Sequence, residues 1–165
     1  MKRKGFSLIE ILVYTAIIGI IGTLLNGILI SLLKIQNRQT ASTEVNQQIN
    51  FVLLNIQRLV RQSVLIDMAT NTPTSTLTLR MADPAKDPTL IYKTGTAIYL
   101  KEGASSEVLL TTGDVNADDL QFTKIYSATN YASVQFTISL SYNTQNPQRA
   151  YSKTITSAVA HPNPQ

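Results

Sequence analysis

Lys4-Gly5-Phe6-Ser7-Leu8-Ile9-Glu10 opens the stretch that decides the fold of this chain. Basic residues 2–4 stand before the glycine, and an apolar run continues after it to Leu33. As a helix, the 28 residues from Phe6 to Leu33 would measure about 42 Å, more than the ~30 Å of bilayer hydrocarbon. The stretch therefore predicts a membrane-spanning helix behind a short basic leader.

Glu10 is the exception within the apolar run. A carboxylate in a membrane segment costs a few kcal/mol and usually faces a partner. If the chain were cut after Gly5, Phe6 would carry a free α-ammonium group, which is the natural counter-charge for a buried acid. Phe6 and Glu10 are four residues apart and share one helical face. The amine could thus pair with Glu10 of its own chain or of a neighbour.

Gly5-Phe6-Ser7-Leu8-Ile9-Glu10 resembles the prepilin motif of type IV pilins and type II secretion pseudopilins. The resemblance implies cleavage between Gly5 and Phe6 by a prepilin peptidase on the cytoplasmic side, followed by methylation of the new amino terminus at Phe6. It also implies that Glu10 registers each incoming subunit against its neighbour through the Phe6 amine. The motif is matched over residues 4–10, and beyond them the similarity is one of overall layout.

Small residues recur every four positions inside the apolar run, at Thr15, Gly19, Thr23, Gly27 and Ser31. Such a ridge lets helices approach closely where lipid offers no hydrophobic drive. One interpretation is a helix–helix seam in a filament core, and the other is the general abundance of Gly, Ser and Thr in membrane helices. Major pilins often carry a proline deeper in this helix. Gly19, Gly22 and Gly27 occupy the corresponding region here, which leaves open where, or whether, the helix loosens on assembly.

Composition excludes several function classes. The net charge of +4 includes the leader cations, so residues 6–165 are nearly neutral and no nucleic-acid partner is indicated. The chain has no cysteine, hence no disulfide and no thiolate metal site. A secretory signal would have a shorter apolar core and an A-x-A-like cleavage site. Basic residues 2–4, against the sparser Lys34 and Arg38, orient the N-terminus inward.

The chain after Leu33 changes character twice. Residues 34–44 are polar without Pro or Gly, and apolar residues then recur at spacings of three and four. Those residues are Val45, Ile49, Val52, Leu53, Ile56, Leu59, Val60 and Val64. The pattern predicts one helix from Phe6 to about Ile66, apolar all round in its first half and amphipathic in its second.

Threonine-rich segments with partial alternation follow a breaker at residues 71–74. The predicted strands are residues 76–81, 89–93, 97–101, 108–112, 120–126, 134–142 and 152–159. We therefore expect an α+β fold, with a long N-terminal helix packed on a C-terminal antiparallel β-sheet, as in pilins. The expected divisions are a leader (1–5), a membrane or filament-core half-helix (6–33), an amphipathic half-helix (34–66) and a β domain with a short frayed tail (67–165).

Few residues indicate chemistry. His161 lies in the expected tail without a second histidine, so neither a zinc site nor a histidine-based triad is predicted. Asp118 and Asp119 are adjacent carboxylates that we interpret as a solvated turn rather than an acid–base pair. Asp114, Asn116 and Asp118 have the alternate spacing of a calcium loop but lack its turn glycine and its bidentate Glu. Calcium is kept as a weak candidate ligand, and an Asx-rich turn is the favoured interpretation.

These observations predict a non-enzymatic, pilin-like structural subunit. It would assemble into a type II secretion pseudopilus or a type IV pilus, and the absence of cysteines with many short strands resembles minor pseudopilins of the J kind. Expected partners are other pilins, the prepilin peptidase, the inner-membrane assembly platform and, before assembly, membrane lipid. The expected location is the bacterial inner membrane, crossed once with the N-terminus cytoplasmic, and then the filament. The alternative is a signal-anchored extracytoplasmic binding domain that never polymerises.

Overall fold

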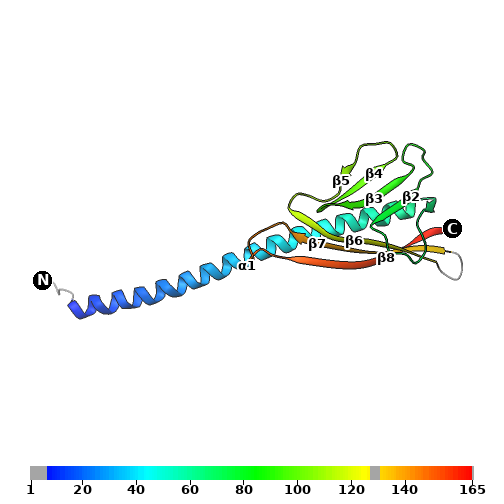
Figure 1. Ribbon diagram of the computed structural model, residues 1–165. Helices are drawn as coiled ribbons and strands as arrows, with labels where there is room; N and C mark the ends of the chain where they lie inside the picture. The colour runs from blue at the N-terminus through cyan, green and yellow to red at the C-terminus, as the bar shows by residue number, and fades with distance from the viewer. Residues whose placement is uncertain (1–6, 127–130, 165) are drawn as a thin grey trace.

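A computed structural model describes residues 7–126 and 131–164, with side chains described as far as residue 162. These residues form one long helix followed by eight strands (Figure 1). The helix is α1 (Leu8–Gln62). The strands are β1 (Leu65–Ile66), β2 (Thr76–Arg80), β3 (Thr89–Thr94), β4 (Ala97–Glu102), β5 (Val108–Leu109), β6 (Val115–Tyr126), β7 (Tyr131–Tyr142) and β8 (Ser152–Pro164).

The two halves of α1 have different surroundings. Figure 1 shows the first half projecting away from the strands and the second half lying along them. Every residue from Leu8 to Leu33 is exposed. In the second half the buried residues are Ala41, Val45, Ile49, Val52, Ile56, Leu59 and Val60. The predicted amphipathic stripe is therefore confirmed along most of its length.

The predicted helix end at Ile66 is wrong, because α1 ends at Gln62. Ser63 takes an extended backbone conformation and its Oγ donates a hydrogen bond to the carbonyl of Val60, at 2.8 Å. Serine hydroxyls compete with the helix through such local bonds. Leu65 and Ile66 then pair with β2 as strand β1. The apolar residues after Gln62, which were predicted to form a last helical turn, instead lie at the helix end and in β1.

The predicted α+β architecture is confirmed, with two antiparallel sheets where the sequence predicted one. Five strands are ordered β1-β2-β3-β4-β5, and three longer strands are ordered β6-β7-β8. The helix packs mainly on β7 and β8. Bridges from Thr70 to Lys124 and from Thr74 to Phe122 tie the segment before β2 to β6. We call the second half of α1 together with the two sheets the head. In it the β2–β3 and β3–β4 hairpins are joined to the three-stranded sheet through these bridges.

One hydrophobic core joins the helix to both sheets. Phe122 of β6 and Phe136 of β7 lie at its centre with ring centroids 6.4 Å apart, and each is at most 1% exposed. Ile49 and Ile56 of α1 and Leu77 of β2 are fully buried in the same cluster. Burial of each such side chain contributes roughly 1.5–3 kcal/mol. Without disulfides, this packing and the strand hydrogen bonds hold the head together.

The frayed tail predicted for residues 161–165 is wrong for residues 161–164, which belong to β8. His161 is 1% exposed, and its Nε2 lies 2.7 Å from the carbonyl oxygen of Ser63. β8 is an edge strand of its sheet, and an edge tolerates prolines such as Pro162 and Pro164 because one side of its backbone has no partner strand. The last strand is thereby fixed to the end of the helix.

Candidate functional site

The predicted processing residues, Gly5 and Phe6, lie outside the described residues. The described part begins at Ser7, which is the N-cap of α1 but makes no side-chain cap hydrogen bond. Glu10 lies in the first helical turn, exposed, and its N–H donates to the carbonyl of Ser7 at 3.0 Å. Ser7 and Glu10 have the spacing of a capping box, but the Ser7 hydroxyl does not cap the helix, so the motif spacing is not used as a cap.

The carboxylate of Glu10 forms no ion pair with any residue in the described ranges. A negative charge near the helix N-terminus is favoured by the helix dipole. That dipole contributes only tenths of a kcal/mol to about 1 kcal/mol, which is less than the cost of the charge in lipid. Glu10 therefore needs a further cationic partner wherever the helix start is dehydrated. Its pairing with the Phe6 amine stays a prediction.

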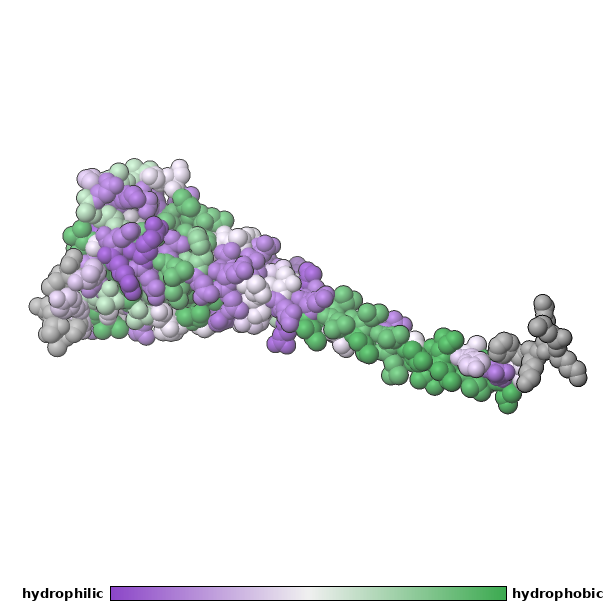
Figure 2. Space-filling model, turned by 180° about the vertical axis from the view of Figure 1, so that it is seen from behind, coloured by the Kyte–Doolittle hydropathy of each residue, from purple (hydrophilic) through white to green (hydrophobic). Residues whose placement is uncertain are grey.

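The first half of α1 presents apolar side chains on all sides. Ile18 is 68% exposed and Leu24 is 63% exposed, in a segment long and apolar enough to cross a membrane by length and composition. A Cβ atom built on Gly19, Gly22 or Gly27 would meet no atom within 4 Å. In the space-filling view this apolar half of α1 projects from the head, whose surface carries both hydrophilic and hydrophobic residues (Figure 2). Such a surface requires lipid or other helices around it, because each exposed aliphatic side chain costs about 1.5–3 kcal/mol in water.

The proposed seam residues are all exposed, and their hydroxyls are satisfied within the helix. Thr15 donates to the carbonyl of Ile11 at 3.0 Å, and Thr23 donates to that of Ile20 at 2.8 Å. Ser31 donates likewise to the carbonyl of Gly27, at 3.0 Å. These bonds let the hydroxyls enter lipid or a helix interface without an unpaired polar group.

The seam also winds round the helix. Each four-residue step advances about 40°, so the ridge from Thr15 to Ser31 turns through about 160°. One straight neighbouring helix therefore cannot contact all five small residues. If the ridge is an interface, at least two neighbours share it, as in a bundle. Its role as a seam stays a prediction.

The calcium candidates do not converge. Asp114 precedes β6, whereas Asn116 and Asp118 lie within it, in a strand that advances about 3.3 Å per residue. Asp118 is at a bulge, where the register passes from Ala117 to Asp119, and accepts a hydrogen bond from Ser141 Oγ at 2.9 Å. The Asx-rich turn predicted for Asp114, Asn116 and Asp118 is thus wrong beyond Asp114, and so is the turn predicted for Asp118 and Asp119, because these residues lie in β6. Calcium binding stays an untested prediction.

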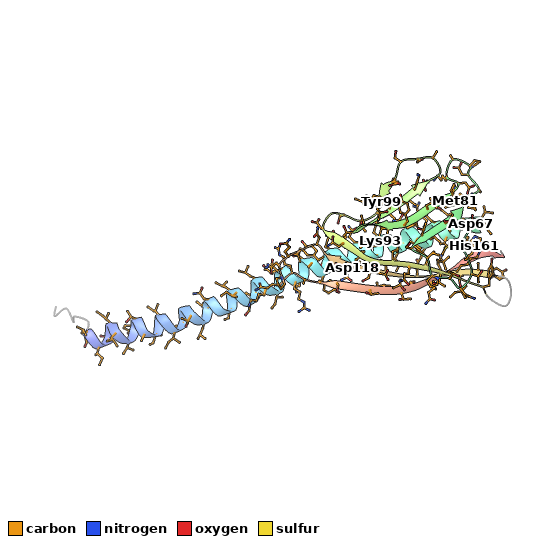
Figure 3. All side chains as sticks on the ribbon, in the orientation of Figure 1. Asp67, Met81, Lys93, Tyr99, Asp118 and His161 are labelled. Carbon is orange, nitrogen blue, oxygen red and sulfur yellow. The ribbon has the colours of Figure 1, made fainter. Side chains whose placement is uncertain are left out.

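The described residues contain no group of three or more His, Cys, Asp or Glu placed to hold a metal ion. The two residue sets that the sequence singled out for chemistry are used structurally. His161 is buried against Ser63, at the end of the helix. Asp118 and Asp119 lie in β6, where Asp118 is exposed and bonded to Ser141. Figure 3 shows Asp118 and His161 well apart on the head.

A contact between α1 and the loop that joins β7 to β8 was not predicted from the sequence. The guanidinium group of Arg149 donates two hydrogen bonds to Oδ1 of Asn37, at 3.2 Å from Nε and 2.9 Å from an Nη. Lys153 Nζ donates to Oδ1 of Asn46, at 2.6 Å, two turns further along α1. The Arg149 contact places the loop beside α1 just after its apolar half ends, and the Lys153 contact joins the start of β8 to the same helix. Residues 112 positions apart gave no signal of this pairing in the sequence.

Comparison with known proteins identifies the N-terminal segment. Residues 1–26 match the family model described as the prokaryotic N-terminal methylation motif. The match supports the resemblance to type IV pilins and pseudopilins, which form a structural, non-enzymatic family, and it does not confirm the J kind. No curated protein and no solved structure matches the chain. The matched segment contains Gly5, Phe6, Glu10 and the first seam residues.

Proposed function

We propose that this chain, which carries the prepilin methylation motif, is a pilin-like subunit that assembles through α1 into a type II secretion pseudopilus or type IV pilus. Prepilin peptidase removes residues 1–5 on the cytoplasmic side and methylates the amino group of Phe6. The head stays outside the cytoplasm, at the end of a single membrane crossing. The assembly platform of the inner membrane then moves the subunit from lipid into the filament.

One observation carries this proposal. The motif lies at the start of the exposed apolar half of α1, while the rest of the chain folds into the head around its own hydrophobic core. A membrane anchor needs the apolar length alone. A subunit that leaves the membrane must in addition replace lipid around this half of α1 with other helices. The ridge of small residues supplies a surface at which helix backbones can approach.

The membrane-inserted stage follows from helix length. Glu10 and Lys34 are separated by about 36 Å along α1 at ~1.5 Å per residue. Hydrocarbon of ~30 Å therefore fits between them, with each charge at a headgroup layer. Basic residues 2–4 of the leader favour the orientation with the N-terminus in the cytoplasm.

Assembly then changes the surroundings of Glu10. Moving the helix into a bundle buries the carboxylate among apolar side chains, which costs several kcal/mol unless an opposite charge offsets it. The amino group of Phe6 in an adjacent subunit is the partner that the motif supplies. Correct register brings the two charges together, and an incorrect register leaves both unpaired. The pair thereby acts as a positional check on each incoming subunit.

Within this class we propose a minor subunit, placed at the tip or acting in initiation. The support is the cysteine-free head with two sheets and several short strands, which differs from disulfide-looped major pilins. Quantitative mass spectrometry of sheared filaments tests this placement. A minor subunit is present at a few copies per filament, and a subunit that accounts for most of the filament mass contradicts the minor role.

Assembly itself is tested by disulfide cross-linking. Because the chain has no natural cysteine, an introduced cysteine is its only thiol. A Gly19→Cys chain is expressed in cells with and without the assembly machinery. The proposal predicts cross-linked species larger than a monomer only when the machinery is present. A chain that stays monomeric in both cells, and still carries its leader, supports the signal-anchored binding domain instead.

A further inference from the structure

A basic notch lies at the junction of the helix and the head. Its helix side carries Lys34 and Arg38, one turn apart and both exposed. Its other side is the β7–β8 loop, through Pro147, Gln148 and Ala150. Together these residues line a cavity of about 420 Å³. A second hollow of about 270 Å³, which shares Ile35 and Arg38, continues it toward Tyr151.

The shape of the notch is fixed by hydrogen bonds, because the loop on one of its sides is bonded to the helix on the other. Arg149 is fixed to Asn37 of α1 through two hydrogen bonds, at 3.2 and 2.9 Å. This pairing leaves the guanidinium group on the same level of the helix as Lys34 and Arg38. Three cations thus gather within about two turns of α1. Figure 2 shows a hydrophilic band at this level, between the apolar half of α1 and the head.

The two segments that line this junction contain no acidic residue, and Asp114 contacts the loop through its carbonyl, which accepts the N–H of Asn143. From Ile11 to Thr43 the helix contains no Asp or Glu, and neither does the loop from Asn143 to Tyr151. Within the described part of the chain, Lys34, Arg38 and Arg149 form no ion pair. Like charges gathered in this way repel one another unless an anion is supplied from outside.

The position of the notch indicates the source of that anion. Lys34 follows the apolar run directly, so the notch faces the headgroup layer on the side of the head whenever the run spans the hydrocarbon. Basic residues there oppose the usual charge bias of membrane proteins, which favours cations on the cytoplasmic side. Their stem carbons can lie along the membrane boundary with the charge in the headgroup layer.

We propose that the notch binds the phosphate groups of anionic phospholipids in the leaflet that faces the head. Lys34 and Arg38 contact the phosphates directly, and Arg149 adds positive charge while holding the loop against α1. The contact fixes the head upright on the membrane, with Glu10 at the opposite headgroup layer. Extraction into a filament must break it. The proposal rests on the membrane-inserted stage of the proposed function and is independent of assembly.

The test uses the full chain in bilayers, with a Gln145→Cys substitution as the sole thiol, labelled with a donor fluorophore. Gln145 is an exposed residue of the loop that does not line the notch. Energy transfer to headgroup-labelled lipid is compared in bilayers of phosphatidylcholine alone and with phosphatidylglycerol added. We expect higher transfer with phosphatidylglycerol, decreasing as salt is raised. The docking equilibrium should weaken roughly fivefold for each basic residue removed.

The variant is Lys34→Gln with Arg38→Gln, and the matched control is Arg58→Gln with Arg61→Gln, which removes the same charge from the far end of α1. The first pair should weaken the docking equilibrium on phosphatidylglycerol roughly 25-fold, and the second should leave it intact. Equal transfer in both bilayers overturns the proposal, as does an equal loss in the control. An unchanged response to phosphatidylglycerol in the Lys34→Gln, Arg38→Gln variant also overturns it. Carbonate extraction checks insertion separately.

Discussion

Nε2 of His161 lies 2.7 Å from the carbonyl oxygen of Ser63, which links the last strand of the head to the end of its helix. Both residues are at least 95% buried, so the contact is shielded from water. Helix ends carry backbone carbonyls without helical partners, and an end buried without other partners is costly. The His161 ring partly meets this requirement at the point where the chain leaves α1.

We expect His161→Ala to destabilise the head by about 2–4 kcal/mol, because it removes a buried ring and a buried hydrogen bond together. Urea denaturation of the full chain in detergent, followed by tyrosine fluorescence, measures the change in a protein that has no tryptophan. Ser63→Ala is the control, since it keeps the carbonyl and loses only the hydroxyl bond to Val60. A His161→Ala cost no larger than that of the control contradicts the role of the ring.

Glu10→Gln keeps the shape of the side chain and removes its charge. We expect membrane insertion to be unchanged and incorporation into filaments to fall at least tenfold, since the Phe6 ammonium of a neighbour is then left unpaired. Glu10→Asp, which keeps the charge on a shorter side chain, should recover part of the assembly. The measurement is the amount of the chain in sheared filaments relative to membranes. Normal incorporation of the Gln variant contradicts the pairing.

The three glycines of the apolar half provide an internal control for the seam. Gly19 and Gly27 lie on the ridge of small residues, whereas Gly22 lies off it, and each has open space where a Cβ would be. Leucine at any of the three should raise helix propensity by a similar amount. We expect Gly19→Leu and Gly27→Leu to reduce filament incorporation severalfold and Gly22→Leu, which lies about 60° from Gly19 round the helix, to have a smaller effect. Equal loss at all three positions contradicts a specific ridge.

The sequence predicted the long helix, with an apolar first half and an amphipathic second half, because both properties depend on the spacing of nearby residues. The stripe from Val45 to Val60 has a period that only a helix can place on one face. The apolar run up to Leu33 is likewise recognised locally, because it is longer than the ~30 Å hydrocarbon core requires. The leader and Glu10 were recognised as one motif because all of their residues lie within a single short segment. These features needed no information from distant residues.

The features that the sequence did not predict depend on contacts between distant residues. The helix was expected to continue to Ile66, but the strand pairing of β1 with β2 uses Leu65 and Ile66. His161 is predicted to lie in a frayed tail because it stands near the end of the sequence, just before Pro162, and its partner Ser63 is 98 residues away. The division into two sheets and the loop contact of Arg149 have the same origin. Local patterns carry no signal for such pairings.

Tyr92 provides a test by pH. A hydrogen bond with Glu107, together with partial burial and the negative charge of that carboxylate, raises the pKa of Tyr92 from 10.0 to about 12. The unfolded chain loses this proton near pH 10, whereas the folded chain keeps it. The contribution of Tyr92 to stability is therefore fully present below about pH 10 and is lost as the pH rises through 12.

Phenolate absorbance during an alkaline titration measures this shift. We expect Glu107→Gln to move one tyrosine component to lower pH, because the negative charge is lost and the amide oxygen accepts only a weaker, neutral hydrogen bond. Tyr92→Phe should remove the same component and serves as its assignment. An unchanged titration curve in the Glu107→Gln variant contradicts the link between the two side chains.

The mass of the mature chain tests the central claim most directly. The protein is extracted from membranes of cells that contain an active prepilin peptidase, and its intact mass and N-terminal peptide are measured. The account predicts a chain that begins at Phe6 with one added methyl group, and a Gly5→Leu variant that keeps its leader. A wild-type chain that still begins at Met1 in those cells contradicts the account of a processed filament subunit.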